Sequence, residues 1–341
     1  MEKKTEKTPR KKWWRWGTNR WIVLALIILG FIGVKYYPPI QPFVQLPAEH
    51  LGAHPLFSTS FLGIGDFYFT NTMTAILLVM FLVIWMAWAF QREAKKAIQR
   101  GDLALKGLPG ALEALLEYLY KMTESTAGKW AWTIFPWFAT ITIMVLLANW
   151  MELIPFVDSV GILEHAEGSG YGIQQLGGVF TTLVKPAVAE GGYRLVPFVR
   201  VVSTDLNFTV ALALIAVIAV QVVGIRSQGT GYFTKFWNVK TFFNKPIFGV
   251  IDWGVGLLEL VSEFSKILSF AFRLFGNIFA GSVLLFVMGS LLGSIVIMPS
   301  MFYMLEFFVG AIQAIVFGLL TMTFMAQATQ GHGGEHEKVK A

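Results

Sequence analysis

The 341-residue chain contains no cysteine, which excludes disulfide bonds, thiolate chemistry and cysteine-based metal sites. It is also poor in charge: 14% of its residues are Asp, Glu, Lys or Arg, whereas a soluble protein carries about 25%. Apolar residues make up 55% of the chain, and they form several runs of about twenty residues. These features exclude an ordinary water-soluble domain and indicate a polytopic membrane protein.

The net charge of +6 is concentrated at the N-terminus, where eight of the 27 basic residues lie in positions 1–20. Because this basic tail precedes an apolar segment, it indicates membrane orientation and contact with lipid headgroups rather than binding to nucleic acid. No small-x-small cleavage site follows the apolar core, so residues 21–37 are predicted to be a retained signal anchor, with cleavage as the alternative.

Five further apolar segments predict membrane spans, at roughly Phe67–Phe90, Trp132–Ile154, Asn207–Ile225, Leu257–Met298 and Met301–Ala328. Lys and Arg are absent from residues 38–68, whereas residues 91–106 contain five. The same alternation continues along the chain, which predicts that both termini are cytoplasmic in a prokaryotic plasma (inner) membrane. The expected fold is therefore an all-α polytopic membrane protein with about six transmembrane helices. Its parts are a cytoplasmic tail at 1–20, the anchor at 21–37, an outer loop at 38–66, a membrane core at 67–328 and a cytoplasmic tail at 329–341.

Two local features refine this fold. Residues 110–120 have the pattern of a short amphipathic helix on the inner surface. A helix from about Leu257 to Gly289 would be on the order of 50 Å long, although the hydrocarbon core is only about 30 Å thick. The last two helices are therefore predicted to be long, strongly tilted and joined in a hairpin that reverses near Gly293.

Polar residues recur along the fifth segment at steps of three and four, which places them on one helix face. They are Glu259, Ser262, Lys266, Ser269, Arg273 and Asn277, followed by Gly281. Arg273 is the only charged residue between positions 267 and 298, and a permanent cation at the centre of a membrane helix costs about 2.5–3.5 kcal/mol. This stripe favours an ion pathway; the alternative is a packing face with interhelical hydrogen bonds.

The sixth segment carries a single acid, Glu306, with Gln313 two turns later on the same face. A hairpin centred near Gly293 would let Gln313 face Arg273. A buried carboxyl can bind and release a proton near neutral pH, whereas a guanidinium cannot. The sequence therefore predicts a proton relay at Glu306 and a fixed charge at Arg273.

The run from Glu259 to Gly281, with its Arg273-Leu-Phe-Gly-Asn277 core, resembles the signature of subunit a of F-type ATP synthases, the membrane stator half of the proton channel. Supporting matches are the segments Asn149–Pro155 and Asp205–Asn207 and the pair Glu306 and Gln313. The resemblance covers about residues 67–328 and leaves the N-terminal anchor as an addition. It implies a non-catalytic, proton-translocating subunit without a cofactor or metal, which couples proton flow to ring rotation and ATP synthesis. The implied partners are the c-subunit ring, the peripheral-stalk b subunits and other ATP synthase subunits.

Individual roles follow from the same resemblance. Arg273 and Asn277 would face the c-ring. The outer half-channel would use Asn149, Glu152, Glu306 and Gln313, and the inner one would use Glu259, Ser262, Ser269 and Asn277. One position departs from the family pattern, because many members place Glu or His where this chain has Ser282. Glu306 is therefore expected to act as the relay alone.

Other functions are less well supported. A stand-alone secondary transporter usually has internal repeats, and an intramembrane enzyme needs a cluster of His or acids at one depth; the sequence has neither an evident repeat nor a His in the spans. His332 and His336 could bind a metal, but a disordered polar tail is the favoured interpretation. Glu49, His50 and His54 in one outer loop, and Glu164-His165 and Glu167 in the other, could collect protons, but plain loops are favoured. The glycine-rich stretch Gly168–Gly172 lacks the Gly-Lys-Ser/Thr of a phosphate-binding loop and is interpreted as a flexible turn.

Overall fold

The computed structural model describes residues 16–36, 48–52, 55, 57–58, 66–101, 105, 107–154, 157–166, 168, 170–176, 180–188, 191–236, 246–292 and 297–330. The long helices are α1 (Trp16–Tyr36), α2 (Asn71–Arg100), α3 (Leu108–Ala127), α4 (Ala131–Trp150), α5 (Leu206–Gln228), α7 (Pro246–Leu292) and α8 (Ile297–Thr329). Four 3-10 segments join them: η2 (Gly128–Trp130), η3 (Met151–Leu153), η4 (Val202–Thr204) and η5 (Gly229–Lys235).

Five helical segments in the described part of the chain are long and apolar enough to cross a membrane. They start at Asn71, Leu108, Leu206, Trp253 and Ser300, and they confirm the predicted class of all-α polytopic membrane protein. The N-terminal anchor is a helix, α1, but its apolar part, Arg20–Ile32, is shorter than these five. Its crossing of the membrane therefore stays a prediction, as do the boundaries proposed for the tails and the core.

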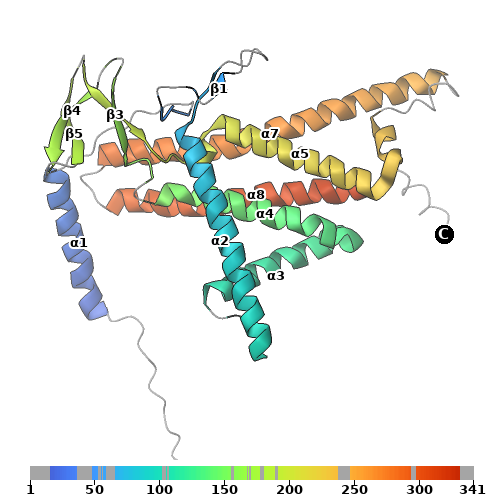
Figure 1. The fold of residues 1–341 in the computed structure, drawn as a ribbon, viewed down its shortest axis with the longest axis horizontal. Coiled ribbons are helices and arrows are strands. Elements are labelled where there is room, and N and C mark those ends of the chain that lie inside the picture. The colour runs from blue at the N-terminus through green and yellow to red at the C-terminus, as the bar shows by residue number, and fades with distance from the viewer. Residues whose placement is uncertain are drawn as a thin grey trace, which may run out of the picture.

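The core lies between α4, α5, α7 and α8, which run alongside one another in Figure 1. Helix α8 contacts α4, α5 and α7, and α5 also packs on α7. Small residues at the centre, Ala213, Ala216, Ala271 and Ala314, are fully buried and let these helices approach closely. The amphipathic helix predicted at 110–120 is part of the longer α3, which packs against α4 through a second core cluster around Leu119 and Ile134.

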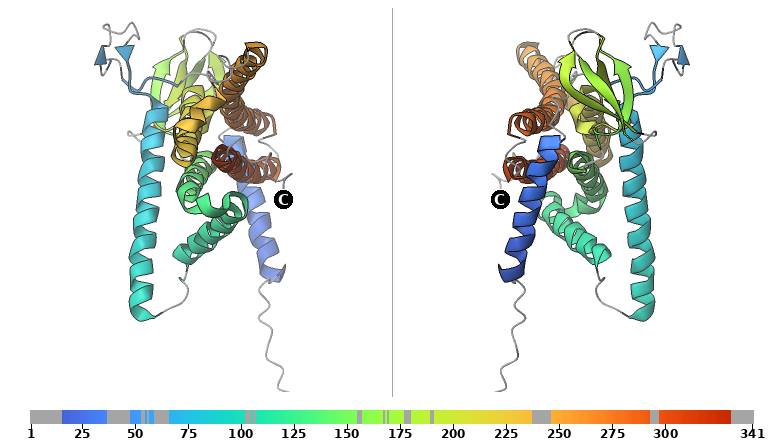
Figure 2. Two further views of the ribbon diagram at one scale, coloured as in Figure 1. Left: turned by 90° about the vertical axis from the view of Figure 1, so that its right-hand side faces the viewer. Right: turned by 90° about the vertical axis from the view of Figure 1, so that its left-hand side faces the viewer.

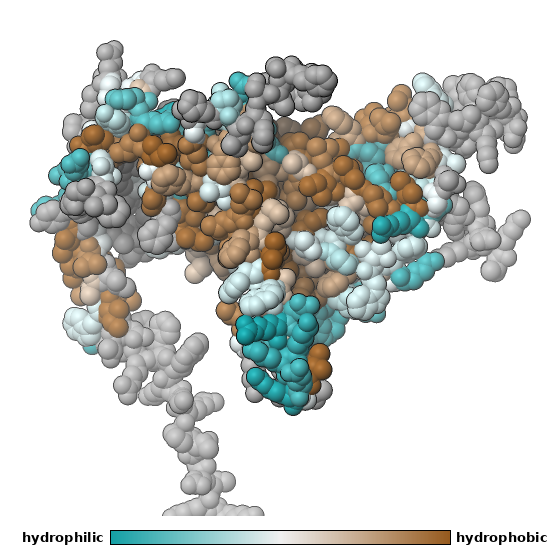
Figure 3. Space-filling view, viewed as in Figure 1, coloured by the Kyte–Doolittle hydropathy of each residue, from teal (hydrophilic) through white to brown (hydrophobic). Residues whose placement is uncertain are grey.

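Helices α7 and α8 form the predicted hairpin. With 47 and 33 residues they are about 70 and 50 Å long, well beyond the roughly 30 Å of a hydrocarbon core. They lie along the brown hydrophobic band of Figure 3, whereas α2 crosses it and ends in a hydrophilic tip (Figures 1 and 3). The predicted start near Leu257 was wrong, because α7 begins at Pro246. A proline is favourable in the first turn of a helix, where its missing N–H would have no helical partner.

A small antiparallel sheet, which the sequence patterns did not predict, covers one end of the bundle (Figure 2). Its strands are β3 (Gly161–His165), β4 (Gly170–Leu176), β5 (Phe180–Val188) and β6 (Tyr193–Pro197), in the order β3-β6-β4-β5. The flexible turn predicted at 168–172 was wrong for Gly170 and Gly172, which begin β4. Gly170 lies against the backbone of Gly192 with no room for a Cβ, so glycine permits the strands to meet. A second, two-stranded sheet pairs β1 (Phe57–Ser58) with β2 (Asp66–Phe67).

Candidate functional site

Arg273 lies in the middle of α7 with its side chain partly exposed. Its Nη2 atom donates a hydrogen bond to the Ser269 hydroxyl at 3.4 Å. Within the described residues no carboxylate lies within ion-pair distance of the guanidinium; Glu259, on the same helix, is paired instead with Lys235 at 2.5 Å. The permanent charge of Arg273 is thus not neutralised by the described part of its own chain.

The seam between α7 and α8 brings predicted residues of both helices together. The Asn277 amide donates to Gln313 Oε1 at 2.7 Å, and Gln313 is 4% exposed. Gln313 therefore faces the residue one turn beyond Arg273, close to the predicted position. One further turn along α7, the Glu306 carboxyl lies directly against Gly281, where a Cβ would overlap it. Asn277 and Gln313, assigned to different half-channels, are in direct contact.

A group of buried carboxyl and hydroxyl groups continues from this seam toward η3. The Glu152 carboxyl lies beside Ser282 and within electrostatic reach of Glu306. In this region four buried atoms make no hydrogen bond of good geometry to another described residue: Glu152 Oε1, Ser282 Oγ, Glu306 Oε2 and Gln313 Nε2. Buried polar atoms without partners are rare and usually mark a water site or a functional site. Three of the four residues predicted for the outer half-channel, Glu152, Glu306 and Gln313, thus each have a buried polar atom without a described partner.

Asn149, the fourth, has a different environment. Its amide donates to the Gly310 carbonyl at 3.1 Å and its oxygen accepts from the Ser203 hydroxyl at 2.6 Å. These bonds connect α4 to α8 and η4, and the side chain is buried. Asn149 therefore holds α4, α8 and η4 together beside the polar group. Its role in proton transfer stays a prediction.

The residues predicted for the inner half-channel are less closely grouped. Ser262 and Ser269 are exposed on α7, and Glu259 is partly exposed. The predicted polar stripe is interrupted at Lys266, whose Nζ donates to Glu263 at 2.8 Å and lies 4.8 Å from the centre of the Phe324 ring. The contacts of Lys266 thus connect the stripe to the interior of the bundle.

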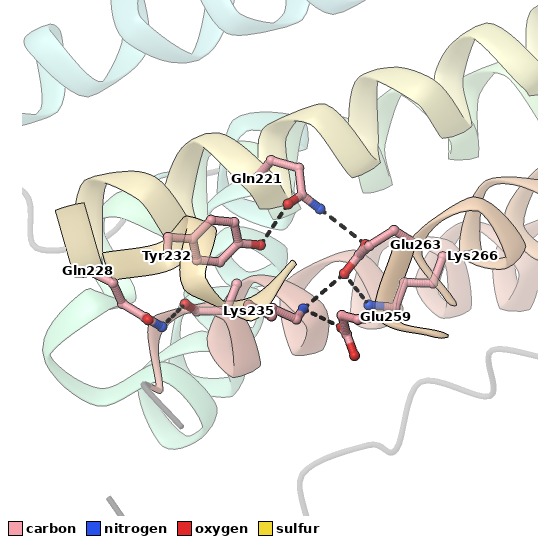
Figure 4. A network of polar contacts seen from close by, with 8 residues as sticks. Gln221, Gln228, Tyr232, Lys235, Glu259, Glu263 and Lys266 are labelled. Atoms are coloured by element: carbon pink, nitrogen blue, oxygen red, sulfur yellow. Dashed lines mark hydrogen bonds and ion pairs between the residues drawn. The ribbon is translucent and has the colours of Figure 1, made fainter. Parts of the chain in front are cut away.

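Glu263 is a charged residue of α7 that the sequence analysis missed. It is 9% exposed and accepts hydrogen bonds from Lys235 at 3.1 Å, Lys266 at 2.8 Å and Gln221 at 3.1 Å (Figure 4). The spacing of three residues between Glu263 and Lys266 was the available signal for this ion pair. Lys235, in η5, also binds Glu259. Burial lowers the pKa of Lys235, but its hydrogen bonds with the two carboxylates outweigh burial and raise it.

The segments predicted to be outside the membrane hold two partly buried acids: Glu49, which the sequence analysis named together with His50 and His54, and Asp158, which it did not single out. Burial raises the pKa of Asp158 to about 7, and the charge of Arg200 opposes the shift. Burial likewise raises the pKa of Glu49, opposed by Arg194 and Arg200. The backbone N–H of Glu49 donates to Asn71 Oδ1 at 3.2 Å, and the Glu49 carbonyl accepts from the backbone N–H of Asn71, at the start of α2, at 3.0 Å. Both carboxyl groups are therefore partly removed from water by the surrounding protein.

The histidines that are described have ring partners. His50 lies 4.4 Å from the Tyr68 ring and His165 lies 4.4 Å from the Tyr193 ring, while Glu164 pairs with Arg194 at 3.3 Å. These contacts place the Glu164-His165 pair on β3 of the four-stranded sheet. His54, His332 and His336 lie outside the described residues. Within the described ranges, no group of three or more His, Asp and Glu side chains is arranged to hold a metal ion.

Known proteins resemble this chain over almost all of its helical core, from α2 to α8. The family model of the ATP synthase A chain matches residues 72–326. The ATP synthase subunit a of Gloeobacter violaceus is 29% identical over 273 residues, which are 78% of this chain and 86% of that protein. The chloroplastic ATP synthase subunit a of Stigeoclonium helveticum is 28% identical over 299 residues, 84% of this chain and 100% of that protein. The ATP synthase subunit a of Mycobacterium ulcerans is 28% identical over 275 residues, which are 78% of this chain and 90% of that protein.

Proposed function

Because the chain belongs to the ATP synthase A chain family, we propose that it is the stator subunit that forms two proton half-channels against a ring of c subunits. It is a multi-pass membrane component of the complex and takes part in proton transport for ATP synthesis. In the proposal it is not catalytic itself, it sits in a prokaryotic inner membrane with cytoplasmic termini, and it contacts the peripheral-stalk b subunits. The observation that carries the proposal is the missing ion partner of Arg273 in the described chain.

In this proposal the partner of Arg273 is a carboxylate on a rotating ring helix. A ring carboxylate that has lost its proton is attracted to the guanidinium, since two opposite charges in a medium of low dielectric constant interact by several kcal/mol. It leaves when the next ring subunit brings another carboxylate. The fixed charge also raises the local positive potential, which prevents a proton from passing directly between the half-channels.

The outer half-channel uses the polar group of Glu152, Ser282, Glu306 and Gln313 in our proposal. Its four unpartnered atoms support this function, since they could be hydrated and could pass a proton toward the seam at Asn277. Glu306 is the titratable relay of α8, because Ser282 cannot exchange a proton near neutral pH. The inner half-channel runs along Ser269 and Ser262 toward Glu259, on the face of α7 that the bundle leaves uncovered.

Replacing the fixed charge tests the proposal. Arg273→Ala should abolish ATP-driven proton pumping, because a ring carboxylate would lose its counter-charge, and it should make the membrane leak protons. Pumping is measured in inverted vesicles with a pH-sensitive dye, and the leak is measured after removal of the catalytic head.

The matched control is Arg92→Ala, which removes an exposed guanidinium that lies over Trp88 at the far end of α2. This variant should pump like the wild type. Normal ATP-driven pumping by an assembled Arg273→Ala complex would refute the proposed role of Arg273.

A further inference from the structure

Four charged side chains meet where η5 packs against α7, and Figure 4 shows how they point toward one another. We call this group the inner ion cluster; it consists of Lys235, Glu259, Glu263 and Lys266. Its two cations and two anions give a net charge of zero. Two neutral groups complete it, because Tyr232 donates to Gln221 at 2.7 Å and Gln221 donates to Glu263 at 3.1 Å.

The two acids of the cluster have different surroundings. One oxygen of Glu263 accepts from both lysines and the other accepts from Gln221, and the side chain is 11% exposed. Within the described residues Glu259 is paired with Lys235 alone, and its side chain is 29% exposed. Three donors favour the ionised form of the Glu263 carboxylate, whereas the more open Glu259 is accessible to water.

The cluster also lies close to the fixed charge. Lys266 precedes Arg273 by seven residues on one continuous helix, a rise of about 10 Å. If Glu263 lost its charge, Lys235 and Lys266 would share one anion, and the cluster would carry a net positive charge. That charge would add to the positive potential of Arg273 along the exposed face of α7.

Resting on the function proposed above, we propose that Glu263 is a positioning residue of the inner half-channel. It keeps the inner ion cluster neutral, so that a proton travelling between the ring and Glu259 meets no excess positive charge. Glu263 does not carry the proton. It binds the two lysines and thereby holds η5 against α7.

The test is passive proton conductance of membranes from which the catalytic head has been removed, driven by a potassium diffusion potential. Glu263→Gln keeps the shape of the side chain and removes its charge. A unit charge about 10 Å from Arg273, where the ring carboxylate exchanges its proton, should at an effective dielectric constant of 20 lower the conductance on the order of tenfold. The double variant Glu263→Gln/Lys266→Gln restores a net charge of zero and should restore most of the conductance.

Two further variants complete the design. Glu263→Asp keeps the charge and should conduct almost as well as the wild type. Glu117→Gln removes an acid from an exposed pair with Lys121 on α3 and should change nothing. The inference is overturned if assembled Glu263→Gln conducts normally, or if the double variant is as slow as the single one, since the latter would show a purely structural role. Failure of the proposed function would appear separately, as normal pumping by Arg273→Ala.

Discussion

At the scale of single residues, the contact between Gly281 and Glu306 shows how one missing side chain makes room for a functional group. The carboxyl of Glu306 occupies the place where a Cβ on residue 281 would lie. Gly281→Ala should therefore push the carboxyl away from the seam, since overpacking a close contact costs about 1–3 kcal/mol. We expect ATP-driven proton pumping to fall about tenfold if roughly 1.4 kcal/mol of this strain opposes proton transfer.

The control for this substitution lies on the same helix. A Cβ on Gly289 would meet nothing within 4 Å, so Gly289→Ala should pump normally and gain up to about 1 kcal/mol of helix stability. Equal pumping by both alanine variants would show that the position of the Glu306 carboxyl does not matter.

The sequence identified residues whose chemistry conflicts with their surroundings in the chain. Arg273 and Glu306 stand alone in long apolar runs, and such charges are conspicuous without a structure. Glu263 was missed because it follows other polar residues, and its burial depends on Gln221 and Lys235 from another part of the chain. Asp158 was missed because its burial likewise depends on how the chain folds around it.

At the scale of helices, Asp205 connects two elements that are far apart in the sequence. One carboxylate oxygen accepts from the Asn207 backbone and caps α5, and the other accepts from the Thr72 hydroxyl of α2, each at 2.9 Å. Asp205→Ala removes both bonds. Loss of an N-cap alone costs about 1 kcal/mol, and the buried Thr72 hydroxyl would lose its acceptor.

We therefore expect Asp205→Ala to lower the midpoint of thermal unfolding of the purified complex in detergent. Asp205→Asn retains one acceptor oxygen and should lie between the alanine variant and the wild type. An unchanged midpoint for Asp205→Ala would mean that this junction does not contribute to stability.

Elements differed in how well the sequence predicted them. The apolar runs predicted the helices of the core, because in a membrane-spanning helix both the lipid-facing and the buried positions are apolar. The start of α7 was predicted about ten residues too late, because Asp252 and the glycines between residues 246 and 257 weaken the helical pattern. The four-stranded sheet was missed because β4 and β5 are polar and glycine-rich in part, and because β3 pairs with β6, which lies about thirty residues further along the chain.

At the scale of the whole molecule, one face of the hairpin remains uncovered. Large apolar residues of α7, Leu260, Phe264, Leu268 and Phe272, are 42–61% exposed, and they alternate with the polar positions Ser262, Ser269 and Asn277. A lipid-facing helix surface would be uniformly apolar. The mixture of apolar and polar residues around Arg273 is what a protein partner with carboxylates would cover, and it supports placing the c-ring there.

The absence of native cysteine makes this arrangement directly testable, because any introduced thiol is unique in the chain. Asn277→Cys places a thiol at an exposed position of α7, and it should form a disulfide with a cysteine placed beside the carboxylate of a ring helix. Ala271→Cys, on the same helix but 0% exposed, should form none, because its thiol points into the bundle. The product is scored as a band shift on a non-reducing gel of intact membranes. Equal cross-linking at both positions, or none at 277 in an assembled complex, would place the ring against a different face of the molecule.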